Sequence, residues 1–248
     1  MSTAITLQAN QQPAAINRRE LMKMLFATSG MVALSQVLPK SAVGSLTTNS
    51  FAQLHSLDTL RTVAASNITK VNSTTFHTTF AGKPFKWINF RNYQLILDQF
   101  NGVVHAKNHV ETNIVLKLGS REFVTTVKFL DDTLQVMNPI THRFMNLPWV
   151  SVPINLTHWL GSEKGLGYLL EEGAKFENSA QIEDIHGRSA YHLQGIASAE
   201  ALSGFIPQAK NEYLVDFWLD TTYGLPQRFQ ISEQHGTRAF MTDFGQFE

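Results

Sequence analysis

Apolar and polar residues alternate along most of the chain from Thr74 to about Trp149, with the two-residue period of β-strands. The clearest run is 110–118. Gly119-Ser120 then predicts a hairpin turn into a second alternating run, 122–129. Further turns are predicted at Asn101-Gly102, Asp131-Asp132 and Asn138-Pro139. Strands joined by such short turns predict an antiparallel meander and not a parallel sheet with crossover helices.

The same alternation returns in the second half of the chain. Residues 174–194 predict a hairpin that turns at His186-Gly187, and alternating runs follow at 213–220, 227–233 and 237–244. The whole chain therefore predicts about 9–11 strands, each able to pair with a neighbour in sequence.

Three segments have apolar residues at helical spacing instead. Ser50–Asn67 carries one apolar stripe behind a possible N-cap at Ser50. Ile154–Leu170 is strongly apolar, and Ser198–Ile206 predicts a short helix that begins at Ser198 and ends before Pro207. The sequence thus predicts an α+β fold in which helices cover one highly curved antiparallel sheet.

Composition excludes several classes of protein and site. Lys plus Arg equals Asp plus Glu at 20 each, so no overall charge favours nucleic acid, and we expect no nucleic-acid partner. The absence of cysteine excludes disulfides, thiolate metal sites and a thiol nucleophile. Hydrophobic residues make up 43% of the chain, which is typical of a globular protein and excludes disorder for its bulk.

The first 44 residues have the layout of an export signal. Arg18, Arg19, Lys23 and Lys40 stand against the single acid Glu20, a net of +3, and a moderately apolar run follows Lys23. Because Leu21 and Lys23 follow the arginine pair, the segment resembles a twin-arginine signal. The apolar run before Pro39 is shorter than the ~20 residues that span a membrane. We expect an export signal at 1–44, cleaved or partly retained, and a single domain at 45–248.

Catalytic and metal-binding patterns are weak. The sequence has no Gly-x-Ser-x-Gly and no His-Glu-x-x-His motif. His105 and His109 would share a face only on a helix, whereas their region predicts strand and turn. Glycines in 161–167 predict a helix break and not a phosphate loop. We expect no enzyme activity, cofactor or metal. A cluster of His142, His158 or His192 with an acid in a cleft would instead indicate an enzyme.

The segment from about Ile154 to Phe229 resembles the mycobacterial LppX/LprAFG lipoprotein family and, behind it, the wider LolA-like fold. The features that carry the resemblance are the apolar segment that ends at Leu169-Leu170, the hairpin at 185–187, the segment from Ala199 to Ile206-Pro207, and Phe217–Asp220 before Gly224-Leu225-Pro226. The resemblance implies a half-barrel whose concave face is covered by helices and encloses an apolar cavity for acyl chains. Family members typically carry a lipobox cysteine, which this chain lacks, so its anchoring must differ.

The inward faces of the predicted elements supply the cavity candidates. Each of these side chains could equally be ordinary core, since periodicity does not separate a filled interior from a hollow one. The candidates are Leu95, Leu97, Ile114, Leu116, Phe123, Val127, Phe129, Leu134, Val136, Trp159, Leu160, Leu169, Tyr213, Val215 and Phe217. Trp149 and Trp159 suit either the rim of a lipid portal or a helix anchor.

Together, pattern and resemblance predict an exported lipid-binding protein that holds acyl chains of an envelope lipid or glycolipid. It would act in the periplasm or on the extracytoplasmic face of the envelope, as a monomer that contacts membranes transiently. The alternative is a sensor or scaffold domain that uses the same fold to bind a partner protein.

Overall fold

The computed structural model describes residues 56–82, 85–90, 93–105, 109–130, 133–138, 140–146, 155–160, 163–206, 209–234 and 238–248. Its helical elements are α2 (Leu57–Ile68), α3 (Leu166–Tyr168), the π-helical turn η2 (Leu169–Gly173) and the 3₁₀ turn η3 (Ala201–Gly204). The strands are β1 (Ser73–Gly82), β2 (Phe85–Phe90), β3 (Tyr93–His105), β4 (His109–Leu118), β5 (Arg121–Leu130), β6 (Thr133–Met137), β7 (Phe144–Asn146), β8 (Ala174–Phe176), β9 (Gln181–Ile185), β10 (Arg188–Ala197), β11 (Tyr213–Asp220), β12 (Pro226–Glu233) and β13 (Arg238–Phe247).

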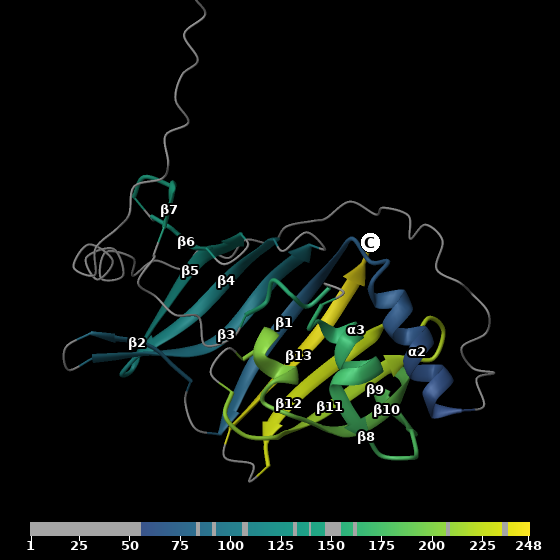
Figure 1. Cartoon of the computed structure of the whole chain (residues 1–248). Coiled ribbons are helices and arrows are strands. Elements are labelled where there is room, and N and C mark those ends of the chain that lie inside the picture. The colour runs from purple at the N-terminus through teal and green to yellow at the C-terminus, as the bar shows by residue number, and fades with distance from the viewer. Residues whose placement is uncertain are drawn as a thin grey trace, which may run out of the picture.

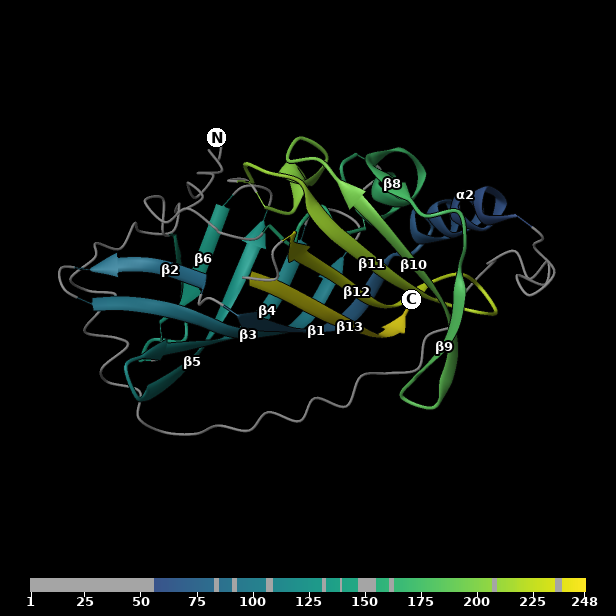
Figure 2. The same cartoon turned by 90° about the horizontal axis from the view of Figure 1, so that it is seen from below.

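All of these strands belong to one antiparallel sheet. Its order is β7-β6-β5-β4-β3-β1-β13-β12-β11-β10-β8, with β2 paired to β3 and β9 to β10. The two halves of the chain meet at β1 and β13 (Figure 1), and Figure 2 shows the curvature of the sheet. The end strands β7 and β8 do not pair with each other in the described residues, so the sheet is open.

The predicted fold class is confirmed in its coarse form, an antiparallel sheet with a few short helices. The sheet has 13 strands, more than the 9–11 predicted. Two of them, β7 and β8, contain three residues each, which is too short for alternation to be recognised.

Helix α2 begins six residues later than the position at which Ser50 would cap it. Its N-cap is Ser56, whose hydroxyl accepts a hydrogen bond from the Thr59 amide at 3.2 Å. Leu60 and Ala64, both on the predicted stripe, are buried. Residues 50–55 lie outside the described part of the chain. In Figure 1, α2 and α3 lie on the same side of the sheet, at the half that contains β10–β13.

The continuous helix predicted for Ile154–Leu170 is wrong. Residues 157–160 form a turn, and helical structure begins only with α3 at Leu166. Lys164 between them has a φ of +55°, which a right-handed helix does not allow. The apolar spacing is real, because Leu156, Trp159 and Leu166 are all fully buried, but irregular backbone buries them.

The turn predicted at Asn101-Gly102 is also wrong, since both residues lie inside β3, opposite Asn113 and Thr112 of β4. Glycine is required there for another reason. A Cβ at Gly102 would lie 2.1 Å from the Glu111 carbonyl oxygen and 2.6 Å from the Thr112 Cα. The glycine therefore permits a close approach of two backbones and does not mark a chain reversal.

Two of the remaining turns agree with the sequence, whereas Asp131-Asp132 and Pro139, where two more were predicted, lie outside the described residues. The β4–β5 hairpin turns at Gly119, with φ +61°, and the β9–β10 hairpin turns at His186-Gly187, both with positive φ. The Ser198 hydroxyl accepts a hydrogen bond from the Ala201 amide at 3.2 Å, but the third segment is the 3₁₀ turn η3, whose N-cap is Glu200, and not an α-helix that begins at Ser198. None of the helices in the described ranges is long and apolar enough to cross a bilayer.

Candidate functional site

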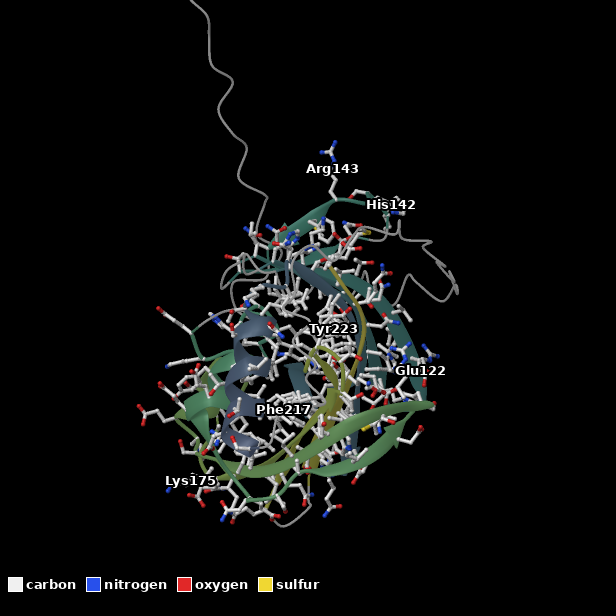
Figure 3. The ribbon with its side chains drawn as sticks, turned by 90° about the vertical axis from the view of Figure 1, so that its right-hand side faces the viewer. Glu122, His142, Arg143, Lys175, Phe217 and Tyr223 are labelled. Atoms are coloured by element: carbon white, nitrogen blue, oxygen red, sulfur yellow. The ribbon has the colours of Figure 1, made fainter. Side chains whose placement is uncertain are left out.

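The inner face of the sheet carries one continuous apolar cluster, and every cavity candidate belongs to it or borders it. Fourteen of the fifteen candidates have at most 6% of their surface exposed and are members of the cluster. Tyr213 is half-buried and packs against it. Figure 3 shows this interior filled with carbon-rich side chains, while Glu122, Arg143 and Lys175 lie at the periphery. The sequence thus placed the inner face correctly, and whether these residues contact a lipid remains a prediction.

A row of phenylalanines crosses the middle of the sheet, and the sequence candidates included only Phe217 of it. Phe229 of β12 lies between Phe217 of β11, with ring centroids 4.6 Å apart, and Phe240 of β13, at 6.3 Å. Phe80 of β1 continues the row from Phe240, at 6.4 Å. The alternation in 227–233 and 237–244 could have identified Phe229 and Phe240, because it places each of them on the apolar face of its strand.

The turn η2 is fixed to α2 by Arg61. Its Nε donates to the Leu170 carbonyl at 2.7 Å, and a terminal nitrogen donates to the Glu171 carbonyl at 2.9 Å. The same guanidinium lies 4.9 Å above the ring of Phe176. Arg61 therefore satisfies carbonyls that η2 leaves without helical partners and holds η2 against the first helix.

Trp159 is a core residue and does not lie at a rim. It is completely buried, with its ring edge-on to Phe76 of β1 at 5.3 Å and to Phe244 of β13 at 5.5 Å. Its indole Nε1 has no hydrogen-bond partner among the described residues. Buried indole N–H groups normally find an acceptor, so this donor is exceptional. Trp149, the other proposed rim residue, lies outside the described residues.

The outer face of the same sheet carries a polar cluster centred on His192. Its Nδ1 lies 2.8 Å from Glu183 Oε1 and its Nε2 lies 3.0 Å from Asp216 Oδ1. The imidazole stacks on Trp218 at 4.2 Å, and the Trp218 indole donates to Glu183 Oε2 at 2.8 Å. The hydrogen bond from Trp218 and, next, that from His192 lower the pKa of Glu183 below its ordinary value.

This cluster does not fit an acid–base site. Both imidazole nitrogens of His192 are already occupied by carboxylates, so neither is free to exchange a proton with a substrate. Glu183 and Asp216 instead fix the β9–β10 hairpin on the sheet. The other histidine pair, His105 and His109, lies across β3 and β4 with the rings stacked at 5.3 Å. Burial and then the neighbouring His109 lower the pKa of His105.

Comparisons with known proteins agree with the architecture. The model of the LppX_LprAFG lipoprotein family matches residues 58–244. No curated protein sequence matches the chain. The chain is similar in structure to lipoprotein LppX of Mycobacterium tuberculosis, with 14% identity, 77% of this chain and 94% of that chain covered, and a TM-score of 0.53. It is also similar to LprF of Mycobacterium bovis, with 9% identity, 77% and 92% covered, and a TM-score of 0.58.

The two structural similarities concern the fold alone, because both identities are low. The family match includes nearly all of α2, the strands through most of β13, and the helical turns between them. With three quarters of the sequence matched, the chain belongs to the LppX_LprAFG lipoprotein family.

Proposed function

We propose that this protein is an exported carrier that holds the acyl chains of an envelope lipid or glycolipid between its curved sheet and the helices on its inner side. The observation that carries the proposal is the apolar cluster on the inner face, which extends from β3–β6 to β11–β13 in the described part of the chain. Burial of each methylene in such surroundings contributes ~0.8 kcal/mol, so affinity needs few directed contacts.

The proposal includes a place of action and a mode of action. The twin-arginine-like segment in 1–44 would bring the protein to the extracytoplasmic side, and membership of a lipoprotein family supports that location. Since the sequence has no cysteine, lipid would not anchor it through a lipobox. A monomeric shuttle or a protein held by its leader are the two remaining modes. We propose a binding role and not a catalytic one.

Lipid loading provides the test. The purified protein would be analysed by native mass spectrometry for bound lipid and titrated with a fluorescent fatty acid. Leu116→Arg should abolish uptake, because Leu116 is 2% exposed on the inner face and a charge there opposes burial of an acyl chain. Val115→Arg is the matched control, since Val115 is the next residue of β4 and its side chain points to the other face.

The outcomes separate the two functions. Bound lipid in the native protein, and uptake by Val115→Arg but not by a folded Leu116→Arg, would support the carrier. A lipid-free spectrum together with no uptake of the fluorescent fatty acid would contradict it and favour the protein-binding alternative. Circular dichroism of both variants would establish that loss of uptake is not loss of folding.

A further inference from the structure

His105 and His109 lie directly opposite each other at the end of the ladder that joins β3 to β4. The chain reverses between them, so the two histidines stand on neighbouring antiparallel strands, and their rings stack with centroids 5.3 Å apart. The expectation that only a helix could bring this pair onto one face is therefore wrong, because a hairpin does so as well.

Both side chains point to the outer face of the sheet. The adjacent residues Val104 and Val110 are 0% exposed and belong to the inner apolar cluster, and successive residues of a strand point to opposite faces. The two histidines themselves are half-buried. The pair is therefore accessible from solvent and lies on the opposite side of the sheet from the apolar interior.

The ring nitrogens of this pair are available for a ligand. Among the described residues, neither His105 nor His109 makes a hydrogen bond or an ion pair, in contrast to His192, whose two nitrogens both face carboxylates. Neutral imidazole is the commonest protein ligand of transition metals. Two such groups on one face thus have the chemistry of a metal chelate.

Two carboxylates give this end of the sheet a negative potential. Glu111 follows His109 by two residues in β4 and so lies on the same face, and Glu248 accepts a hydrogen bond from Ser73, which is opposite His105 on β1. Burial and then His109 lower the pKa of His105, whereas Glu248 and Glu111 act to raise it because they favour positive charge at the ring. The same carboxylates would favour a bound cation.

The carboxylates act on such an ion by charge and not as ligands. Glu111 is paired with Lys128 at 2.9 Å, and the described residues hold no group of three or more His, Cys, Asp or Glu side chains that could bind a metal ion. The protein therefore offers two ligands, and water would fill the remaining positions.

The geometry of the pair suits a single ion. Residues directly opposite each other on neighbouring strands have Cβ atoms about 4.5–5.5 Å apart, and the χ2 torsion of histidine is soft. Both rings can therefore turn one nitrogen toward a shared point. Two imidazoles on one tetrahedral ion, with metal–nitrogen distances of about 2.0–2.1 Å, have centroids about 5 Å apart, close to the separation of 5.3 Å in the stacked pair.

We propose that His105 and His109 bind a divalent ion of the late first-row transition metals, such as Zn²⁺, as a two-histidine chelate on the outer face. Nitrogen ligands select these ions over Mg²⁺ and Ca²⁺, which prefer oxygen. A bound ion would link β3 to β4 and stabilise the folded chain. The site does not depend on the proposed lipid-binding function.

Isothermal titration calorimetry of the full chain with Zn²⁺ tests the site. One ion should bind per chain, and an excess of Mg²⁺ should not displace it. His105→Ala and His109→Ala should each weaken binding by at least about tenfold, because the chelate needs both ligands. His77→Ala is the matched control, since His77 is exposed on the outer face of β1 with Asn101 and not a histidine opposite it on β3; its affinity should equal that of the wild type.

Thermal unfolding gives a second readout. Zn²⁺ should raise the unfolding temperature of the wild type and of His77→Ala, but not that of the two chelate variants. No zinc binding by the wild type, unchanged affinity in both chelate variants, or a loss in only one of them would overturn the chelate. Displacement of Zn²⁺ by Mg²⁺ would overturn it too, in favour of a carboxylate site. Circular dichroism would establish that each variant is folded, and His105→Asn and His109→Asn repeat the comparison if an alanine variant is not.

Discussion

Two of the described tryptophans, Trp159 on the inner face and Trp218 on the outer face, provide a matched pair for testing what a buried indole N–H contributes to stability. Trp159 is 0% exposed and its indole N–H has no partner, whereas Trp218 is 9% exposed and donates to Glu183 at 2.8 Å. Replacement of either by phenylalanine removes about 40 Å² of buried apolar surface, worth about 1 kcal/mol. The two replacements differ in what happens to the N–H group.

For Trp159→Phe, removal of an unsatisfied buried donor returns about 1–3 kcal/mol. We therefore expect a net change between no effect and a stabilisation of about 2 kcal/mol in the lipid-free protein. For Trp218→Phe, loss of a hydrogen bond to a carboxylate adds to the loss of area. Because Glu183 is 39% exposed, the hydrogen-bond part is reduced by solvent, and we expect a total loss of about 2–3 kcal/mol.

Urea unfolding of the lipid-free protein, followed by far-ultraviolet circular dichroism, would measure both changes without relying on tryptophan fluorescence. The reasoning is refuted if Trp159→Phe destabilises the protein by more than about 2 kcal/mol, or if it costs as much as Trp218→Phe. Either result would mean that the Trp159 N–H is satisfied in solution. Trp159→Ala, which leaves a large cavity, should cost about 3–5 kcal/mol and calibrates the assay.

Three further predictions concern the backbone, the outer face and the link from α2 to the turn between β11 and β12. Gly102→Ala should destabilise the protein by more than about 2 kcal/mol in the same urea assay, because its Cβ would meet the β4 backbone at 2.1 Å. The control is Asn101→Ala at the exposed neighbouring position, which should change the free energy of unfolding by under about 0.5 kcal/mol. The pKa of Glu183 is lowered in the folded state, so the stability that its ionised carboxylate contributes is present above the ordinary glutamate pKa and is lost as pH falls through the folded-state pKa. In Glu183→Gln, the free energy of unfolding should therefore fall less steeply with decreasing pH than in the wild type. An unchanged pH dependence would contradict this. Asn67→Ala should cost about 1–3 kcal/mol by leaving the buried end of α2 and the Tyr223 carbonyl without their bond, and thermal unfolding would measure it.

The hairpins and the inner face were predictable because local sequence specifies them. In β4 and β5, alternation fixes which residues face inward, and Gly119 fixes where the chain reverses, so the pairing of Leu116 with Phe123 follows directly. The candidates on β11 were found in the same way. These predictions need only neighbouring residues, and tertiary context does not overrule them.

Other features depend on distant residues, and sequence spacing alone missed them. The reason for glycine at position 102 lies in the backbone of Glu111 and Thr112. The outer cluster joins Glu183, His192 and Asp216 from three strands, and only the register of β9, β10 and β11 brings them together. In 154–170 the apolar spacing correctly indicated burial but not helix, because side chains from a turn can reach the core as well as those from a helix.

The periodicity of the sequence did not decide whether the interior is filled or hollow, and two buried polar atoms bear on that question. The ring of Phe244 packs against Trp159, and Phe244 lines a pocket at the end of β13 together with Gln227. In the described part of the chain, Trp159 Nε1 is a buried donor without an acceptor and Gln227 Oε1 is a buried acceptor without a donor. Filled cores rarely leave such atoms unpaired. Under the carrier function proposed above, a carbonyl of the bound lipid would accept from the Trp159 indole N–H. Comparison of lipid-loaded and lipid-free protein therefore carries more information than either state alone: Trp159→Phe should be harmless to the empty protein and should weaken the loaded one.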